Sequence, residues 1–145
     1  MRQIIQIITL LIAFTSCKSD QSLQIESKWE EAKVFRENNK LGKAITLLKD
    51  IIENNQTSSR AAEAQFLIAD IYLNDLKDYD ISINEFEKVV NNFEKTDMAK
   101  KAIFMIAYIY SNNLDAYSLA IKSFKDFKNK YPNDELIPSV DYELS

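Results

Sequence analysis

Residues 65–72 read QFLIADIY, and 38 residues later the stretch 103–110 reads IFMIAYIY. Residues 26–35 are a weaker copy of the same stretch. Downstream of the copies an isoleucine recurs at the same interval, at Ile45, Ile83 and Ile121, and apolar residues follow it at steps of three. Apolar positions spaced three and four residues apart form one face of a helix. The sequence therefore predicts a unit of two helices that is present three times.

Short polar segments separate the two helices of each unit. They are rich in Asn and Asp, as turns are, and lie at 38–40, 74–78 and 111–115. Side chains that can accept hydrogen bonds from a first helical turn precede the predicted helices. The expected N-caps of the first helices are Thr57 or Ser58 and Thr96 or Asp97, and Asp80 and Asp115 are expected as N-caps or near-caps of the second helices.

Turn-forming residues are otherwise scarce, with one Gly and two Pro in 145 residues. Few turn formers favour long helices over many short strands. Pro132 is expected to end the last long helix, because proline cannot continue it. Pro138 then fits the first turn of a final short helix over 138–144.

A small residue recurs at one position of each helix: Ala32, Ala69 and Ala107 in the first helices, and Ala44, Ser82 and Ala120 in the second. This pattern resembles the tetratricopeptide repeat, although the units are longer than the usual ~34 residues. The resemblance implies an all-α fold in which antiparallel helix pairs stack as a right-handed α-α superhelix. It places three repeats at about 25–56, 58–94 and 97–132 of a domain spanning 25–145. A coiled coil is the structural alternative, but the Asn-rich breaks and the 38-residue period argue against it.

The N-terminus carries an apolar run, residues 4–14 (IIQIITLLIAF), preceded by Arg2. The run has the length of a signal-peptide core and is short for a membrane span. It is followed by Thr15, Ser16 and Cys17, the sole cysteine. This order resembles a bacterial lipobox, although Phe14 stands where Leu is usual.

The lipobox resemblance implies a signal peptide over 1–16, acylation of Cys17 and a polar tether over 17–24. The alternatives are an ordinary secretory signal or a buried hydrophobic N-terminal strand. Several acyl chains on one cysteine would anchor the chain firmly to a membrane.

The sequence pattern of the repeats is similar to that of a group of tetratricopeptide proteins of the bacterial cell envelope. The pattern A-x-F-x-I-A-x-x-Y, followed by x-Y-x-x-A-I-x-x-F-x-x-F-x-x-x-Y-P, resembles BamD-like lipoproteins of outer-membrane protein assembly and YbgF-like partners of Tol-Pal. The BamD-like proteins carry about five repeats, and the YbgF-like proteins add a coiled coil that is missing here. The resemblance implies a lipid-anchored protein of the cell envelope, on the outer membrane and facing the periplasm.

The composition lacks residues that common catalytic sites use. There is no His, and the single Gly42 excludes a Gly-rich phosphate loop. Adjacent carboxylates such as Glu30 and Glu31 do not share a helix face. The net charge of −4 offers no electrostatic footprint for nucleic acid. We therefore expect a non-enzymatic protein with no cofactor and no metal.

The candidate site lies on the first helices, which line the concave side of tetratricopeptide arrays. One aromatic residue per unit occupies the same register, with polar residues up to two turns on. The predicted partner-binding residues are Trp29, Lys33, Arg36, Phe66, Asp70, Asn74, Phe104, Tyr108 and Asn112. A structural interpretation of the aromatic row, as the seam between neighbouring first helices, stays equally open.

The sequence thus predicts a non-catalytic scaffold for protein–protein interaction in the bacterial envelope. It would bind a peptide or protein segment on its concave face and act in outer-membrane protein assembly. It would contact the membrane through its lipid anchor and would not bind nucleic acid. The alternative is a structural subunit that packs through its helix faces or its C-terminal end.

Overall fold

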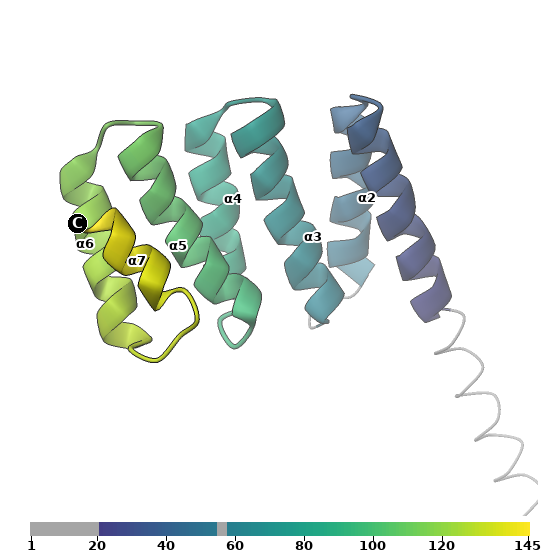
Figure 1. Ribbon diagram of the computed structural model, residues 1–145. Coiled ribbons are helices and arrows are strands. Elements are labelled where there is room, and N and C mark those ends of the chain that lie inside the picture. The colour runs from purple at the N-terminus through teal and green to yellow at the C-terminus, as the bar shows by residue number, and fades with distance from the viewer. Residues whose placement is uncertain (1–20, 55–57) are drawn as a thin grey trace, which may run out of the picture. The chain divides into compact units, whose positions relative to one another are not determined.

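The computed structural model describes residues 21–54 and 58–145. Every regular element in these two ranges is helical (Figure 1). The predicted signal peptide, Cys17 and the candidate cap Thr57 lie outside the described residues. The chain divides into two compact parts, one up to Leu47 and one from Leu48 onward. Each part is described by itself.

The first part contains a helix over 21–37 and the beginning of α2 (Leu41–Asn54). The backbone N–H of Lys40 donates to the carbonyl of Phe35 at 2.8 Å and closes the turn between them. Residues 21–24 of the predicted polar tether belong to this helix. This stretch contains no Gly or Pro that would stop a helix from extending.

The second part is a stack of helices. Each packs on the next one along the chain as far as α7, and the first helices α3 and α5 also touch each other. The elements are α3 (Ser59–Asp70), continued by the π-helix η1 (Ile71–Asp75), α4 (Tyr79–Asn92), α5 (Asp97–Asn112), α6 (Tyr117–Lys130) and α7 (Ile137–Glu143). The predicted fold class, all-α with stacked antiparallel helix pairs of tetratricopeptide type, is confirmed.

Side-chain caps begin three of these helices. Ser58 and Thr96 accept hydrogen bonds from the backbone N–H of Ala61 and Ala99, as predicted. The cap of α4 is Asp78 rather than Asp80, which lies in the first helical turn.

Asp115 is not the N-cap of α6 but lies one residue before the N-cap position. The residue before α6 is Ala116, which has no side-chain acceptor. Asp115 takes a left-handed backbone conformation, with φ 51°, and its carboxylate accepts a hydrogen bond from the Tyr117 hydroxyl at 2.9 Å.

A left-handed residue closes the loop of every unit at the same register. Asn39, Lys77 and Asp115 have φ values of 55°, 55° and 51°, and they are spaced at the 38-residue period. Asn and Asp tolerate this region better than most residues, whereas the Cβ of a lysine is strained in it. The loop geometry therefore repeats even where the residue type does not.

The small residues lie where helices approach closely. Ala69, Ala107 and Ser82 are fully buried, and Ala120 is nearly so. The Ser82 hydroxyl donates to the carbonyl of Ala69 at 2.9 Å, which satisfies the one polar group of the set. A nearby buried amide, Gln65 Nε2, donates to Glu85 Oε2 at 2.7 Å and ties α3 to α4.

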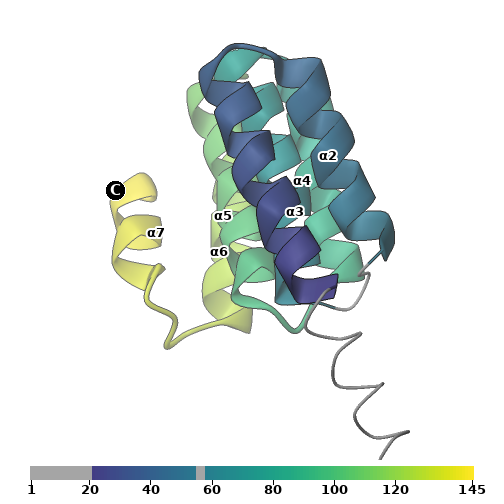
Figure 2. The ribbon, with the colours of Figure 1, turned by 90° about the vertical axis from the view of Figure 1, so that its right-hand side faces the viewer.

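The last helix, α7, lies beside α5 and α6 (Figures 1 and 2). Its Val140 is fully buried in a cluster with Ala107, Ala120 and Phe124. Because α7 is short, it leaves part of α6 open. Ile121 is 44% exposed, whereas Ile83, its equivalent one repeat earlier, is 9% exposed.

Candidate functional site

The predicted site residues of the first unit lie on the helix over 21–37. Trp29, Lys33 and Arg36 are half-buried there. The Lys33 ammonium lies 5.9 Å from the centre of the Trp29 ring, and it also pairs with Glu30 at 2.8 Å. These three residues belong to the first compact part, whereas the other six predicted site residues belong to the second.

The phenylalanines of the predicted row pack inside their own helix pairs. The Phe66 ring meets Phe86 of α4 edge-on, with 4.9 Å between ring centres. In the next unit the Phe104 ring meets Phe124 of α6 in the same way, at 5.5 Å. Both Phe66 and Phe104 are half-buried and lie against core clusters. These ring contacts are made within a helix pair rather than at a seam between neighbouring first helices, and only the remaining exposed surface of each ring is open to a partner.

The polar members of the predicted site in the second part are exposed, except for the half-buried Asp70. We call Asp70, Asn74, Tyr108 and Asn112 the first-helix strip. Asn74 and Asn112 are exposed, and Tyr108 keeps 36% of its surface accessible. The Asn74 amide donates to Asp70 Oδ1 at 2.7 Å, and the Asn112 amide donates to the backbone carbonyl of Tyr108 at 3.2 Å. The strip thus combines one aromatic ring with carboxamide groups held by their neighbours.

One residue next to the strip was not predicted from the sequence. Glu143, at the end of α7, accepts a second hydrogen bond from the Asn112 amide, at 3.5 Å from Nδ2 to Oε2. No motif marks Glu143, because only the folding of α7 onto the stack brings it there. Together with Asp70 it makes this surface acidic.

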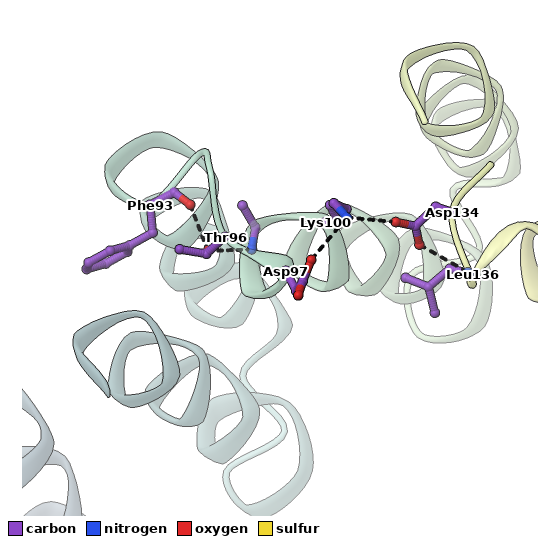
Figure 3. A network of polar contacts seen from close by, with 7 residues as sticks. Phe93, Thr96, Asp97, Lys100, Asp134 and Leu136 are labelled. Atoms are coloured by element: carbon purple, nitrogen blue, oxygen red, sulfur yellow. Dashed lines mark hydrogen bonds and ion pairs between the residues drawn. The ribbon is translucent and has the colours of Figure 1, made fainter. Parts of the chain in front are cut away.

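A second polar cluster connects the start of α5 to the loop before α7 (Figure 3). Lys100 Nζ lies 3.0 Å from Asp97 Oδ1 and 3.0 Å from Asp134 Oδ2. Asp134 also accepts a hydrogen bond from the backbone N–H of Leu136, at 3.1 Å. A cavity of about 270 Å³ adjoins this cluster, with Lys101 and Glu135 in its lining.

The charges of this cluster shift the pKa values of its members. The hydrogen bonds from Lys100 to Asp134 and Asp97 raise the pKa of the Lys100 ammonium above its ordinary value. Burial opposes ionisation of Asp134, but the N–H of Leu136 and the Lys100 ammonium outweigh it and lower the pKa of this carboxyl. Because Lys100 already serves two carboxylates, the cluster is a structural tie rather than a binding site.

Candidate metal-ligand groups and candidate membrane spans are both absent from the described residues. No group of three metal-ligating side chains forms within 21–54 and 58–145. Among the same residues, no helix is both long and apolar enough to cross a membrane. The hydrogen bond from the Tyr117 hydroxyl to Asp115 raises the pKa of this tyrosine above its ordinary value.

Comparison with known proteins identifies a family for nearly the whole chain. The family model described as soluble NSF attachment protein, SNAP, matches residues 12–139. No curated protein matches the chain significantly. The matched family is one of helical-repeat adaptors, which agrees with the stacked helix pairs and makes protein–protein interaction the functional class.

Proposed function

We propose, on the premise that this chain belongs to the soluble NSF attachment protein family, that it is a scaffold holding an extended segment of a protein partner along the first-helix strip. The family's name describes attachment to a protein, NSF, and so supports a protein as the partner here. Arrays of helix pairs commonly offer the faces of their first helices as extended binding surfaces. The proposal assigns no catalytic step to the chain.

The observation that carries this proposal is the strip itself. Asp70 and Tyr108 occupy the same register in successive units, as do Asn74 and Asn112 one turn on. A carboxamide both donates and accepts hydrogen bonds, which suits the backbone of an extended peptide. The exposed Tyr108 ring adds an apolar contact with a polar tip, a residue type that is enriched in binding hot spots.

The same proposal places the protein in the bacterial cell envelope. Its support is the apolar run at 4–14, the order Thr15-Ser16-Cys17 and the presence of a single cysteine in the chain. Acylation of Cys17 would anchor the scaffold to a membrane, most simply the periplasmic side of the outer membrane. The likeness of the repeats to BamD-like and YbgF-like proteins favours a role in outer-membrane protein assembly.

The anchor is tested by metabolic labelling with an alkyne fatty acid. We expect the wild-type chain to be labelled and to remain with the membrane fraction, and Cys17→Ser to lose both properties because the thiol is the acceptor. Equal labelling of the two proteins, or no labelling of either, would contradict the anchor. The outcome is independent of the binding surface, so it leaves the scaffold proposal to its own test.

The binding surface is tested by capture from detergent-solubilised native membranes, followed by mass spectrometry. Proteins retained by the wild-type chain are then compared with those retained by a Tyr108→Ala/Asn112→Ala variant. Loss of a hot-spot contact should weaken a specific partner by tenfold or more. Tyr117→Ala, an exposed tyrosine on α6, is the matched control and should retain the partner.

A second candidate function rests on the open C-terminal end. Leu119 and Ile121 of α6 are 50% and 44% exposed, and Tyr117 is 58% exposed. Exposed apolar side chains at the end of a helical stack are typical of a contact with another subunit. Under this alternative the chain is a structural subunit of an envelope complex. The capture experiment would then show the reverse pattern, with Tyr117→Ala losing the partner and the strip variant keeping it.

A further inference from the structure

A groove lies on the side of the stack opposite the first-helix strip. It is bounded by α4 and α6, the second helices of two successive units, and its floor is α5 between them. On α5 the floor residues Ile103 and Ile106 lie about 170° around the helix from Tyr108 and Asn112, at about 100° per residue. We call this the second-helix groove. Its volume is about 450 Å³, which is within the range of ligand-binding clefts.

The floor of the second-helix groove is apolar. Val90, Ile103 and Ile106 line it, and each is half-buried rather than sealed in the core. Val90 and Ile106 rest on the core cluster of the α3–α5 layer, and Ile103 rests on the cluster beneath α6 and α7. The groove therefore follows the boundary between two core clusters, where apolar side chains stay partly accessible.

The rims of the groove are acidic and polar. Glu87 and Asn91 of α4 form one rim, and Ser123 and Asp126 of α6 form the other. The carboxylates of Glu87 and Asp126 are exposed and form no ion pair or hydrogen bond with other described residues. Lys122 precedes Asp126 by one helical turn but does not pair with it. Among the residues that the structure describes, no basic side chain lines the groove.

Beyond this groove, a basic group already bridges the same two helices. Lys130, the last residue of α6, lies with its Nζ 3.8 Å from Oε1 of Glu94, just past the end of α4. An ammonium can thus satisfy a carboxylate across the gap between the second helices. Glu87 and Asp126 hold the same kind of carboxylate on opposite rims, with no cation from the described residues between them.

We propose that the second-helix groove binds a basic peptide segment of a protein partner, with aliphatic side chains on the floor and Lys or Arg side chains between Glu87 and Asp126. The apolar floor supplies area to bury, and the two carboxylates specify the sign of the flanking charges. An acidic rim disfavours the anionic surface of a membrane, which would be repelled by both carboxylates. This site is separate from the first-helix strip and does not depend on it.

The test measures fluorescence anisotropy with the purified full chain. The probe is a fluorescein-labelled ten-residue peptide in which two isoleucine pairs alternate with Lys-Arg pairs. A comparison peptide carries Glu in place of every Lys and Arg. Binding is measured for the wild-type chain, for Glu87→Gln/Asp126→Asn and for Ser123→Arg, which places a cation of the chain's own in the groove. The matched control Glu31→Gln/Glu53→Gln removes the same number of exposed carboxylates elsewhere.

The proposal expects the basic peptide to bind the wild-type chain and the control equally. Glu87→Gln/Asp126→Asn should weaken binding about three- to tenfold, as the loss of exposed charge pairs does. Raising the salt from about 0.05 to 0.5 M should weaken wild-type binding and hardly affect the double variant. Ser123→Arg should weaken binding more than Glu87→Gln/Asp126→Asn does, because the arginine both repels the basic peptide and fills the groove.

Several results would overturn the proposal. These are no binding of the basic peptide, equal binding of the acidic peptide, or equal losses in the control and the groove variants. Sedimentation of the chain alone and binding to phosphatidylglycerol vesicles test the other occupants. A dimer, or a vesicle complex, that Glu87→Gln/Asp126→Asn abolishes would assign the groove to a second copy or to a membrane. All substituted rim positions are exposed or half-buried polar residues, and circular dichroism verifies that each variant is folded.

Discussion

The Nζ of Lys100 lies 3.0 Å from Oδ2 of Asp134, and this ion pair joins the first turns of α5 to the loop that leads into α7. The Asp134 side chain is 9% exposed, and the backbone N–H of Leu136 holds its other oxygen. This carboxylate thus ties the start of α5 to the loop before α7, in addition to the Asn112–Glu143 hydrogen bond and the Lys128–Asp141 ion pair that hold α7 itself. The buried Val140 of α7 depends on that loop for its position.

Asp134→Asn should loosen α7 without unfolding the stack. The amide keeps the shape of the side chain but loses the charge that Lys100 and the N–H of Leu136 favour. Hydrogen bonds to charged groups contribute about 1.5–3 kcal/mol, and the amide retains part of this, so we expect a loss of about 1–2 kcal/mol in the free energy of unfolding, measured with urea. Glu135→Gln, at an exposed neighbour, is the control and should change little.

At acidic pH the wild-type protein should lose its greater free energy of unfolding relative to Asp134→Asn. The pKa of Asp134 is lowered by folding, so the carboxylate stabilises the folded state fully above its ordinary value of 3.8. That stabilisation is lost as the pH falls through the lower pKa of the folded state. Urea titrations at pH 7 and at a series of pH values below 4 measure this. A difference between the two proteins that persists undiminished at the lowest pH would contradict the assignment.

Phe104→Ala should destabilise the protein much more than Tyr108→Ala. The Phe104 ring packs edge-on against Phe124, and truncation of a packed ring costs about 3–5 kcal/mol, somewhat less where the ring is half-buried. Tyr108 is 36% exposed, and its truncation should cost less than about 1 kcal/mol. Thermal melting of both variants measures this. Similar melting temperatures would favour the original prediction that Phe104 is a partner-binding residue rather than part of the core.

Lys77→Gly should make the protein more stable. Lys77 has φ 55°, a conformation that strains any residue with a Cβ and costs glycine nothing. We expect the free energy of unfolding to rise by about 0.5–1 kcal/mol. This figure allows for the entropy that glycine adds to the unfolded chain. Asn39→Gly, at the equivalent loop position, is the control and should gain less, because asparagine already tolerates this region. A loss of stability in Lys77→Gly would mean that the lysine side chain contributes more than the strain costs.

Ala107→Glu should abolish folding of the last units. Ala107 is fully buried in the cluster with Ala120, Phe124 and Val140, so the new side chain would bring an unpaired charge into a close helix contact at a cost of several kcal/mol. Ser118→Glu places the same charge on the exposed side of α6 and should be tolerated. Circular dichroism and melting compare the two. A stable Ala107→Glu variant would show that this contact is not close.

The 38-residue period predicted the helix pairs well because apolar spacing reports the buried face of each helix directly. Ser58 and Thr96 were predictable as caps for the same local reason. The left-handed Lys77 was not, because lysine carries no signal for that conformation and tertiary context imposes it.

The candidate site was only partly predictable. The register of Asp70 and Tyr108 on one helix face follows from the sequence, and both lie next to their predicted polar neighbours. That Phe66 and Phe104 turn toward the second helices depends on how the pairs pack. The contact of Glu143 with Asn112 and the rims of the second-helix groove join residues from different helices, which no single periodicity encodes.

The solvent exposure of Ile121 has a consequence for local unfolding of the chain. Units of a repeat array are stabilised by the neighbours they pack on. Because α7 covers only part of α6 and leaves Ile121 44% exposed, the amides of α6 should exchange with deuterium through local openings of lower free energy than those of α3 and α4. A partner that covers Ile121 would slow exchange in α6 first, and this protection would report end-on binding before the partner is known.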